Sequence, residues 1–577
     1  MRTLILVAIL LMTGSGPSVA ATVAGTSSAR LAAIGDDYWD WQMRTHPTWA
    51  TYLGDHRFDD ELEDLSPRAR MARQGRMQKL RARIAELSLD ALTPAERVSA
   101  RVLDETLATD LEGLAVRAYE YDVNQLDGPQ VGLFELASFH PTDTREGFYT
   151  LSRRLEAIPR YLAQYEANLR DGLAAHRTAP RVIVERVIGQ LQRLGEKPAD
   201  QSPFAAVVKK APADLAARMN EALAGAVMPA FAHLRRFLAD EYLPHARPLV
   251  GLSTMPGGAA SYKYLIRRHT TTQLTADEIH QIGLAELAKI RAEADVIAKR
   301  NGYQDATAYF TAIRKDPKNY ATTREGVLAR YREVLARALA ALPRAFARLP
   351  KAPVIVKPIE EFKERESPAA YYYSAPHDRS RPAAFYANTY DPASRPLYNA
   401  TALTVHEAVP GHHLQIALAQ EIPGLPMFRR EGDFTAFTEG WALYCERLAD
   451  ELGLYENDLA RAGMLTFQAW RACRLVVDTG MHAKGWTREQ AIAFMNANLA
   501  LSEKDIVAEV ERYITWPGQA LAYMIGMREI RRLRTEAQTT LGGKFDLKTF
   551  HDVVLRNGAV PLAVLAEEVG AWVKSAR

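Results

Sequence analysis

Residues 406–413 read His-Glu-Ala-Val-Pro-Gly-His-His, and this octapeptide decides how the rest of the chain is interpreted. It places three imidazoles and one carboxylate within eight residues. A histidine followed at once by a glutamate, with more histidine one or two turns later, is how zinc hydrolases place two metal ligands and a general base on one surface. The sequence therefore predicts a metal site for which most of the chain is scaffold.

The spacing of the histidines departs from the common pattern. In His-Glu-x-x-His the two histidines share one helix face, but here the fourth residue after His406 is Pro410. In a regular helix His413 would lie two turns, roughly 10.5 Å, from His406, which is too far for both to bind one zinc. We therefore expect a local bulge at the Pro-Gly pair that brings either His412 or His413 to the metal. The remaining histidine would support a ligand or face substrate.

A third ligand has to come from elsewhere, because catalytic zinc sites keep three protein ligands and one open position. Glu439 is the leading candidate, since it follows the histidines by one helix-turn-helix length. Glu446 lies two turns further up the same face and is the alternative ligand, or the residue that orients a ligating histidine. We expect one Zn²⁺ per chain.

Several stretches resemble one bacterial family. Residues 404–415, with the octapeptide at their centre, look like the signature of the family catalogued as domain of unknown function 885. Further stretches agree with that family, at residues 269–272, 274–280, 385–389, 438–442, 478–482 and 517–520. The resemblance covers nearly the whole mature chain.

That family in turn resembles helical gluzincin peptidases, such as the angiotensin-converting enzymes and the carboxypeptidase Taq group. The resemblance implies a mainly α, large two-lobed metallopeptidase-like fold with a deep cleft and zinc-dependent hydrolysis of short peptides. It transfers the chemistry better than the specificity. Exopeptidase and endopeptidase activity both remain open.

Glu407 is the expected general base. Its side chain points about 100° further round the helix than that of His406, so it can reach a water on the zinc without binding the metal. Zinc would polarise the scissile carbonyl and lower the pKa of its water toward about 7. The oxyanion needs a further donor, for which His482, with Asp478 one turn earlier, and Tyr523 are the candidates.

Candidate substrate contacts come from two regions. Ala352 to Pro358 and Ala383 to Thr389 read as strands just before the metal-binding helix. A small sheet there can present an edge strand with which an extended peptide pairs. The side chains singled out are Tyr386 and Asn388 in the second strand, and Arg512 and Tyr513, which are suited to a substrate carboxylate.

Length and local pattern predict two helical lobes. The 577 residues exceed the ~250–300 at which single cores usually stop growing. The proline- and glycine-rich stretch from Pro244 to Gly258 is the expected boundary between an N-terminal helical lobe, 22–250, and a C-terminal catalytic lobe, 251–577. Capping boxes open three segments of helical apolar spacing, at Thr93, Thr275 and Thr487.

Residues 1–21 read as an export signal. A positive end is followed by an apolar run from Leu4 to Met12 and a small-x-small site, so we expect cleavage after Ala20 or Ala21. The apolar run is too short to span a bilayer. The mature protein is expected in the periplasm or the medium. Cys445 and Cys473 lie in apolar helical patterns and are expected to be buried thiols.

Charge argues against one class of partner. The net charge of +3 is small against 72 basic and 69 acidic residues, so nucleic-acid binding has no electrostatic support. Two alternatives to a peptidase remain. One is a zinc hydrolase of non-peptide amides or esters, and the other is a non-catalytic exported protein that binds a ligand. The sequence leaves the oligomeric state and the physiological substrate open.

Overall fold

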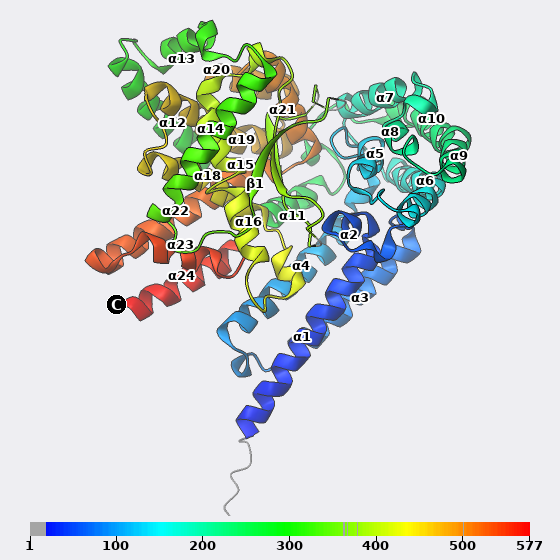
Figure 1. The fold of residues 1–577 in the computed structure, drawn as a ribbon, viewed down its shortest axis with the longest axis horizontal. Coiled ribbons are helices and arrows are strands. Elements are labelled where there is room, and N and C mark those ends of the chain that lie inside the picture. The colour runs from blue at the N-terminus through cyan, green and yellow to red at the C-terminus, as the bar shows by residue number, and fades with distance from the viewer. Residues whose placement is uncertain (1–18, 362–363, 366, 378, 500) are drawn as a thin grey trace, which may run out of the picture.

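The computed structural model describes residues 19–577 except 362–363, 366, 378 and 500. Helices dominate and one small sheet interrupts them, as predicted (Figure 1). Most of the predicted signal peptide, residues 1–18, lies outside the described residues. Among the residues that are described, no helix has both the length and the apolar composition needed to cross a bilayer.

The predicted capping boxes form at all three positions. The hydroxyls of Thr93, Thr275 and Thr487 each accept a hydrogen bond from the backbone N–H three residues later, whose Glu or Gln side chain returns the bond. These reciprocal bonds satisfy donors that have no partner inside the helix. They begin α4 (Pro94–Val116), α12 (Ala276–Arg300) and α20 (Arg488–Asn498).

The first half of the chain contributes to two separate cores. The helices that gather at the right of Figure 1 have a hydrophobic cluster of their own, which includes Leu155 and Phe231. They are α5 (Pro129–Phe139), α6 (Arg145–Ala174), α7 (Arg181–Gly195), α8 (Ala205–Val208), α9 (Ala213–Ala222) and α10 (Met228–Arg236). In contrast, Leu31, Leu80 and Leu103 share a cluster with residues of the second half. Those three come from α1 (Val19–Thr45), α3 (Pro67–Ala85) and α4, while α2 (Pro47–Leu53) packs by a smaller cluster.

The stretch expected to separate the lobes interrupts the helical pattern. Between Leu243 and Gly258 it forms only two short 3-10 turns, and α11 (Gly258–Thr270) follows. The division into lobes of 22–250 and 251–577 stays a prediction, because the hydrophobic clusters join α1, α3 and α4 to the second half of the chain.

The sheet has three strands and not two. The predicted strands appear as β1 (Val354–Pro358) and β3 (Ala383–Ala387), which pair in parallel, and β2 (Ala370–Tyr373) pairs antiparallel to β3. The strand order β1-β3-β2 makes β3 the central strand. The strand that carries Tyr386 is therefore paired on both sides, and the edges of the sheet are β1 and β2. Pairing of a peptide with an edge strand stays a prediction.

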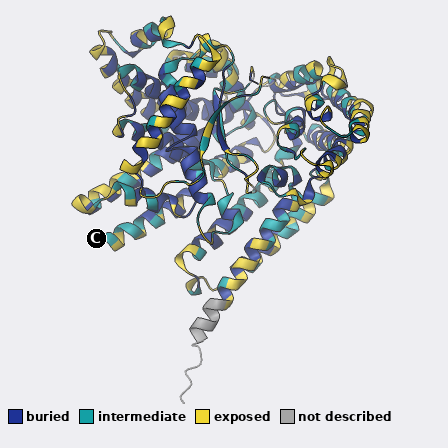
Figure 2. Cartoon of the chain, viewed as in Figure 1, coloured by how far each residue is buried: buried dark blue, intermediate teal, exposed yellow. Residues whose placement is uncertain are grey.

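The second half of the chain packs around a buried set of helices. Figure 2 shows buried residues concentrated there, while exposed residues lie on the outer faces of helices such as α3. Gly440 and Gly526 let two of these helices, α18 and α22, cross in close contact, since a Cβ on Gly440 would lie 2.5 Å from the Cα of Gly526. The helices are α13 (Ala306–Lys315), α14 (Arg324–Ala341), α15 (Ala400–Glu407), α16 (His412–Gln420), α17 (Met427–Arg430), α18 (Thr435–Glu451), α19 (Asp458–Lys484), α21 (Glu503–Thr515), α22 (Ala522–Leu541), α23 (Leu547–Leu555) and α24 (Leu562–Ala576). Both cysteines are free and buried among them, as expected.

Candidate metal centre

The octapeptide breaks its helix completely, where a bulge was expected. Helix α15 ends at Glu407, the Val409–Pro410 peptide is cis, and α16 begins at His412. Proline removes a backbone donor and cannot continue the hydrogen-bond ladder. The two histidines therefore lie on different helices, and the spacing rule for a single helix does not apply to them.

Glycine is required at position 411 by a close backbone approach. A Cβ on Gly411 would lie 2.0 Å from the carbonyl oxygen of His406, so no other residue fits without moving the chain. The turn is also held from α18, because the indole Nε1 of Trp441 donates to the carbonyl of Pro410 at 2.9 Å and the thiol of Cys445 donates to it at 3.3 Å. The turn is thus fixed against the helix that carries Glu439.

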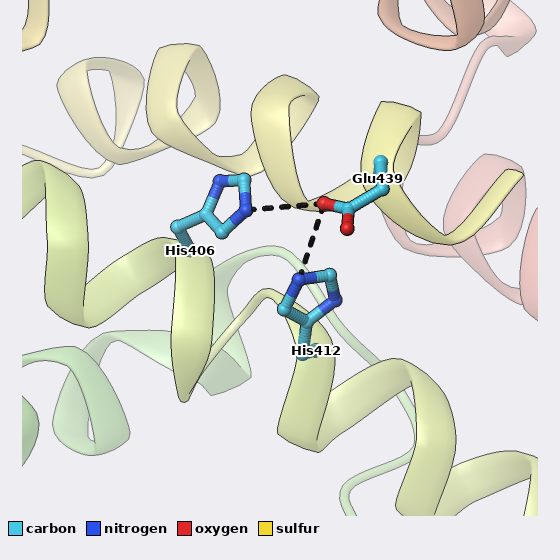
Figure 3. A group of neighbouring side chains, drawn as sticks. All are labelled: His406, His412 and Glu439. Carbon is cyan, nitrogen blue, oxygen red and sulfur yellow. Dashed lines mark ion pairs between the residues drawn. The ribbon is translucent and has the colours of Figure 1, made fainter. Parts of the chain in front are cut away.

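His406, His412 and Glu439 converge in this turn (Figure 3). The Nε2 atoms of both histidines lie 3.4 Å from Oε2 of Glu439. The two rings are nearly perpendicular, at 89°, with centroids 4.9 Å apart. One ligand atom from each residue lies within 4.8 Å of the others. The structure thus brings His412, and not its neighbour, together with His406.

The three side chains suit a divalent cation. Oε2 of Glu439 and Nδ1 of His412 are buried and have no hydrogen-bond partner within the described chain. Buried polar atoms are rarely left without a partner. A cation bound to this carboxylate oxygen would supply the partner that it lacks. Two imidazoles and a carboxylate are also the donor set of catalytic zinc sites, which leave a fourth position open.

Glu446 stands behind His406 instead of beside Glu439. Its Oε1 lies 2.9 Å from Nδ1 of His406, which leaves the other ring nitrogen facing the cluster. Glu446 is itself held by Gln468, whose Nε2 donates to Oε2 at 3.1 Å, and by Arg471, whose Nη2 lies 3.4 Å from Oε1. This is the geometry in which a carboxylate fixes the orientation of a metal-binding histidine, the second of the roles expected for Glu446.

The charges of His406 and Glu439 stabilise each other, because the pKa of the histidine is raised and that of the glutamate is lowered. Burial alone would lower the pKa of His406, but the carboxylates of Glu439, at 3.4 Å, and of Glu446, at 2.9 Å, outweigh that effect and raise the pKa to about 9. Burial would raise the pKa of Glu439, yet the two histidines hold it well below its usual range. Glu439 is therefore ionised and available as an anionic ligand at neutral pH.

Two predicted catalytic residues adjoin the cluster. Glu407 follows His406 at the end of α15, is 9% exposed, and receives no hydrogen bond on its carboxylate from the residues described. The ring of Tyr523 stacks near that of His406, with centroids 6.2 Å apart and planes 18° from parallel. Its hydroxyl accepts a hydrogen bond from Nη2 of Arg512 at 3.1 Å, so its own proton remains free to be donated.

His413 points away from the cluster, contrary to one of the two alternatives. Its Nε2 lies 3.0 Å from the carbonyl oxygen of Ala352 and therefore donates, so Nδ1 accepts from the hydroxyl of Tyr372, also at 3.0 Å. Both ring nitrogens are thus occupied. Burial lowers the pKa of His413 to about 4, which keeps the ring neutral. It joins α16 to the sheet.

His482 likewise has no nitrogen left for an oxyanion. The backbone N–H of Leu252 donates to Nδ1 at 3.2 Å, and Nε2 donates to the carbonyl oxygen of Tyr513 at 2.9 Å. The side chain is fully buried, and burial lowers its pKa to about 3. Its neighbour Asp478 does not orient it but accepts from the hydroxyl of Tyr262 at 2.6 Å. Both residues tie α19 to the chain around α11.

The predicted substrate contacts have different surroundings. Asn388 is fully buried, and its side-chain amide donates to the carbonyl oxygens of Glu364, Ser367 and Pro368, so it holds a loop of the sheet. The half-buried ring of Tyr386 stacks on Tyr371, with centroids 5.1 Å apart. Neither residue joins the metal cluster.

Arg512 and Tyr513 differ in their exposure. The hydroxyl of Tyr513 accepts from Trp470 and Arg474 and donates to Glu509 at 2.7 Å, and the side chain is fully buried. The side chain of Arg512 is 19% exposed.

Three further residues of this region were not predicted from the sequence, namely Arg471, Arg474 and Glu509. Two arginines within the apolar run 470–477 were a usable signal, because buried arginines need partners.

A sizeable cavity lies elsewhere in the molecule. It has a volume of about 1210 Å³ and is lined by residues of α3, α4, α12, α22 and α24, among them Arg81, Ile282 and Arg528. None of the predicted site residues lines it. Its guanidinium groups are paired, for example Arg81 with Asp104 at 2.7 Å, so it offers no evident chemistry of its own.

Comparison with known proteins relates the chain to one family and to several solved structures, two of which are described below. The model of a family described as bacterial proteins of unknown function, DUF885, matches residues 47–569. A crystal structure described as "the putative lipoprotein from Colwellia psychrerythraea" is 31% identical, covers 95% of this chain and all of that chain, and has a TM-score of 0.91. A structure described as "a putative lipoprotein of unknown function from Shewanella oneidensis" is 21% identical, covers 93% of this chain and 99% of that one, and has a TM-score of 0.73. The second likeness shows the fold alone. No curated protein matches the chain.

Proposed function

The chain belongs to the bacterial family of unknown function DUF885, and on this premise we propose that it is an exported zinc metallopeptidase that hydrolyses short peptides. The observation that carries the proposal is the convergence of His406, His412 and Glu439, with Glu446 behind the first histidine. Three features favour a catalytic zinc site: the donor set, a buried carboxylate oxygen of Glu439 without a hydrogen-bond partner in the described chain, and an orienting carboxylate.

Metal binding and proton transfer would be carried out by different side chains of the site. His406, His412 and Glu439 would hold the ion, and a bound zinc supplies Lewis-acid polarisation of a carbonyl oxygen. Glu407 takes a proton from the attacking water as the new C–O bond forms, and delivers it to the amine nitrogen as the C–N bond breaks. Its lack of hydrogen-bond partners among the described residues favours this role.

Tyr523 is the donor that would stabilise the oxyanion. Its ring lies against His406 and its hydroxyl proton is free, because the hydroxyl oxygen is already engaged by Arg512. A donor aimed at developing negative charge is worth most in a site from which water is largely excluded. Since Tyr523 is 7% exposed, its surroundings meet that condition.

The proposal also specifies the size of the substrate and the location of the protein. Among the metal-binding side chains Glu439 is the most exposed, at 17%, against 3% for His406 and 11% for His412. The low exposure of these three side chains suits short peptides better than folded proteins, and a two-lobed fold with a deep cleft is part of the proposal. Export is supported by the N-terminal pattern and by the lipoprotein descriptions of the two similar structures.

The test combines metal content with turnover. Purified mature protein is expected to hold about one zinc per chain by mass spectrometry, and His406→Ala and His412→Ala are expected to lose it. His233→Ala is the matched control, because that histidine is 61% exposed and pairs with Glu166 in another part of the fold. Absence of bound zinc, with none taken up on addition, would remove the basis of the proposal.

The catalytic step is tested with a panel of short peptides beside acyl amides and esters. Glu407→Gln should keep its zinc and lose turnover by a factor of about 10²–10⁴, the usual contribution of a general base. Turnover of non-peptides alone would instead favour the hydrolase of amides or esters. Full activity in Glu407→Gln would exclude the mechanism, and zinc binding without any turnover would favour a ligand-binding protein.

A further inference from the structure

Three arginines lie beside the metal cluster, and we call Arg471, Arg474 and Arg512 the arginine cluster. The guanidinium carbon of Arg474 lies 4.5 Å from the ring centroid of Tyr523, and that of Arg471 lies 5.9 Å from it. Arg512 donates to the hydroxyl of the same tyrosine. Because this ring also stacks near His406, one tyrosine separates the predicted metal ligands from three positive charges.

Each arginine of the cluster has one buried N–H group without a hydrogen-bond acceptor among the described residues. Nε of Arg471, Nη1 of Arg474 and Nε of Arg512 are buried and have no hydrogen-bond partner in the part of the chain that the structure describes. The side chains of Arg471 and Arg474 are only 6% and 3% exposed. A buried donor without an acceptor destabilises the fold, and more so when the donor is charged. The arginine cluster therefore calls for an acceptor that the protein does not provide.

The carboxylates around the arginine cluster are already shared. Oε2 of Glu509 lies 3.1 Å from Nη2 of Arg474, and Oε1 lies 3.6 Å from Nη1 of Arg512. Glu446 serves Arg471 but also holds His406. Two carboxylates, Glu446 and Glu509, thus pair with three guanidinium groups, which leaves the arginine cluster with one positive charge in excess. An anion is the ligand that this imbalance favours.

We propose that the arginine cluster binds the free α-carboxylate of a peptide substrate, so that the protein removes residues from the carboxyl end. The planar fork of a guanidinium group matches a carboxylate with two parallel hydrogen bonds. Arg512 makes the first contact, because its side chain is 19% exposed while the other two are buried. The inference rests on the proposed peptidase function and specifies its substrate as the carboxyl terminus of a short peptide.

The position of the arginine cluster next to Tyr523 fits this assignment. A terminal carboxylate lies within one residue of the last peptide bond, so its receptor has to adjoin the metal ligands and the oxyanion donor. Tyr523 meets both demands, since it contacts His406 on one side and Arg512 on the other.

The first test is binding and does not depend on turnover. N-acetyl-dialanine and its carboxyl-terminal amide are titrated calorimetrically into zinc-free protein. The acid is expected to bind about 10- to 100-fold more tightly than the amide, the range for hydrogen bonds to a charged group. Arg512→Gln should abolish this preference and Arg512→Lys should restore part of it. Circular dichroism checks that each variant is folded.

A matched control comes from the same helix as two members of the arginine cluster. Arg461→Gln removes a half-buried guanidinium from α19 that pairs with Asp450 at 2.9 Å, away from Tyr523. It should leave the preference for the acid unchanged. Equal binding of acid and amide, binding of neither, or a preference that survives in Arg512→Gln would each overturn the inference.

A second arm separates the inference from the proposed function. The zinc-loaded protein is given one peptide sequence with a free and with an amidated carboxyl terminus. A kcat/KM about 10-fold or more in favour of the free acid, lost in Arg512→Gln, supports both. Equal cleavage of the two peptides, with no preference in binding, overturns the carboxylate site and leaves the peptidase standing. Selective binding of the acid without any cleavage upholds the site and overturns the peptidase.

Discussion

His412 and His413 are neighbours in the sequence, yet His412 faces Glu439. Both ring nitrogens of His413 are hydrogen-bonded elsewhere, to the carbonyl of Ala352 and to the hydroxyl of Tyr372 in β2. The choice between the two histidines depends on the direction in which α16 leaves the broken turn, which the residue pattern does not encode. His482 was an equally plausible oxyanion donor from its residue type, but both of its ring nitrogens are hydrogen-bonded to backbone groups.

Glu446 offers a prediction about affinity. Replacing it with Gln removes the charge that holds Nδ1 of His406 at 2.9 Å. Loss of such an orienting partner typically costs 10- to 100-fold in metal affinity, so competitive zinc titration should show weaker binding of that order. Glu451→Gln is the control, since this carboxylate on the same helix is 49% exposed and pairs with Arg534. Unchanged affinity in Glu446→Gln would mean that the histidine is oriented by its packing alone.

Asp478 predicts how stability depends on pH. Burial raises its pKa to about 7, despite hydrogen bonds from Tyr262 and from the backbone of Gly518. The unfolded carboxyl titrates near 3.9, so between about pH 4 and pH 7 the folded state keeps a proton that the unfolded state has lost. Stability therefore falls as the pH rises through this window and is constant above it.

The measurement compares wild type with Asp478→Asn, whose amide oxygen can still accept both hydrogen bonds but does not titrate. Thermal unfolding from pH 4 to pH 8.5 should show the variant gaining on the wild type as the pH rises, with the difference levelling off above pH 7. A difference that does not vary with pH would show that Asp478 is ionised in the folded protein throughout.

At the scale of the element, local signals were reliable and long-range ones were not. The capping boxes at Thr93, Thr275 and Thr487 could be predicted because each involves only four consecutive residues. The break at Pro410 was located, but its form depends on contacts from α18, 31 and 35 residues away. Strand β2 escaped prediction because Tyr371–Tyr373 forms a strand only by pairing with β3, which no local pattern encodes.

The crossing of α18 and α22 gives a prediction about packing. In Gly440→Ala the new methyl would lie 2.5 Å from backbone atoms of Gly526, which cannot rotate away. Overpacking of this kind costs about 1–3 kcal/mol, and the shift would also displace Glu439 next door. Gly75→Ala in α3 is the control, since nothing lies within 4 Å of its Cβ, and it should gain about 0.5–1 kcal/mol from helix propensity. Denaturant unfolding of both variants measures the contrast, and equal effects would contradict the close crossing.

At the scale of the whole molecule, the site depends on elements that are far apart in the chain. The predicted metal ligands come from α15, α16 and α18, and the arginine cluster comes from α19 and α21. Length alone predicted two lobes, but α1, α3 and α4 share their hydrophobic cluster with the second half. The lobe to which a helix belongs depends on which apolar faces pack together, and amino-acid composition does not specify this packing. The octapeptide could be recognised because its chemistry is local, while its supporting residues could not.

Since three helices meet at the cluster, metal binding should be coupled to the stability of the second half of the chain. A ligand that binds only the folded state stabilises it by about 2.7 kcal/mol at a hundred times its Kd. Calorimetry of chelator-treated protein, with and without added zinc, should therefore show a rise in Tm that grows with zinc concentration. His412→Ala removes one ligand and should abolish the rise, whereas His233→Ala, altered outside the cluster, should preserve it. An equal rise in all three proteins would place zinc at another site. No rise in the wild type would mean that His406, His412 and Glu439 form a structural ion-pair group and no metal centre.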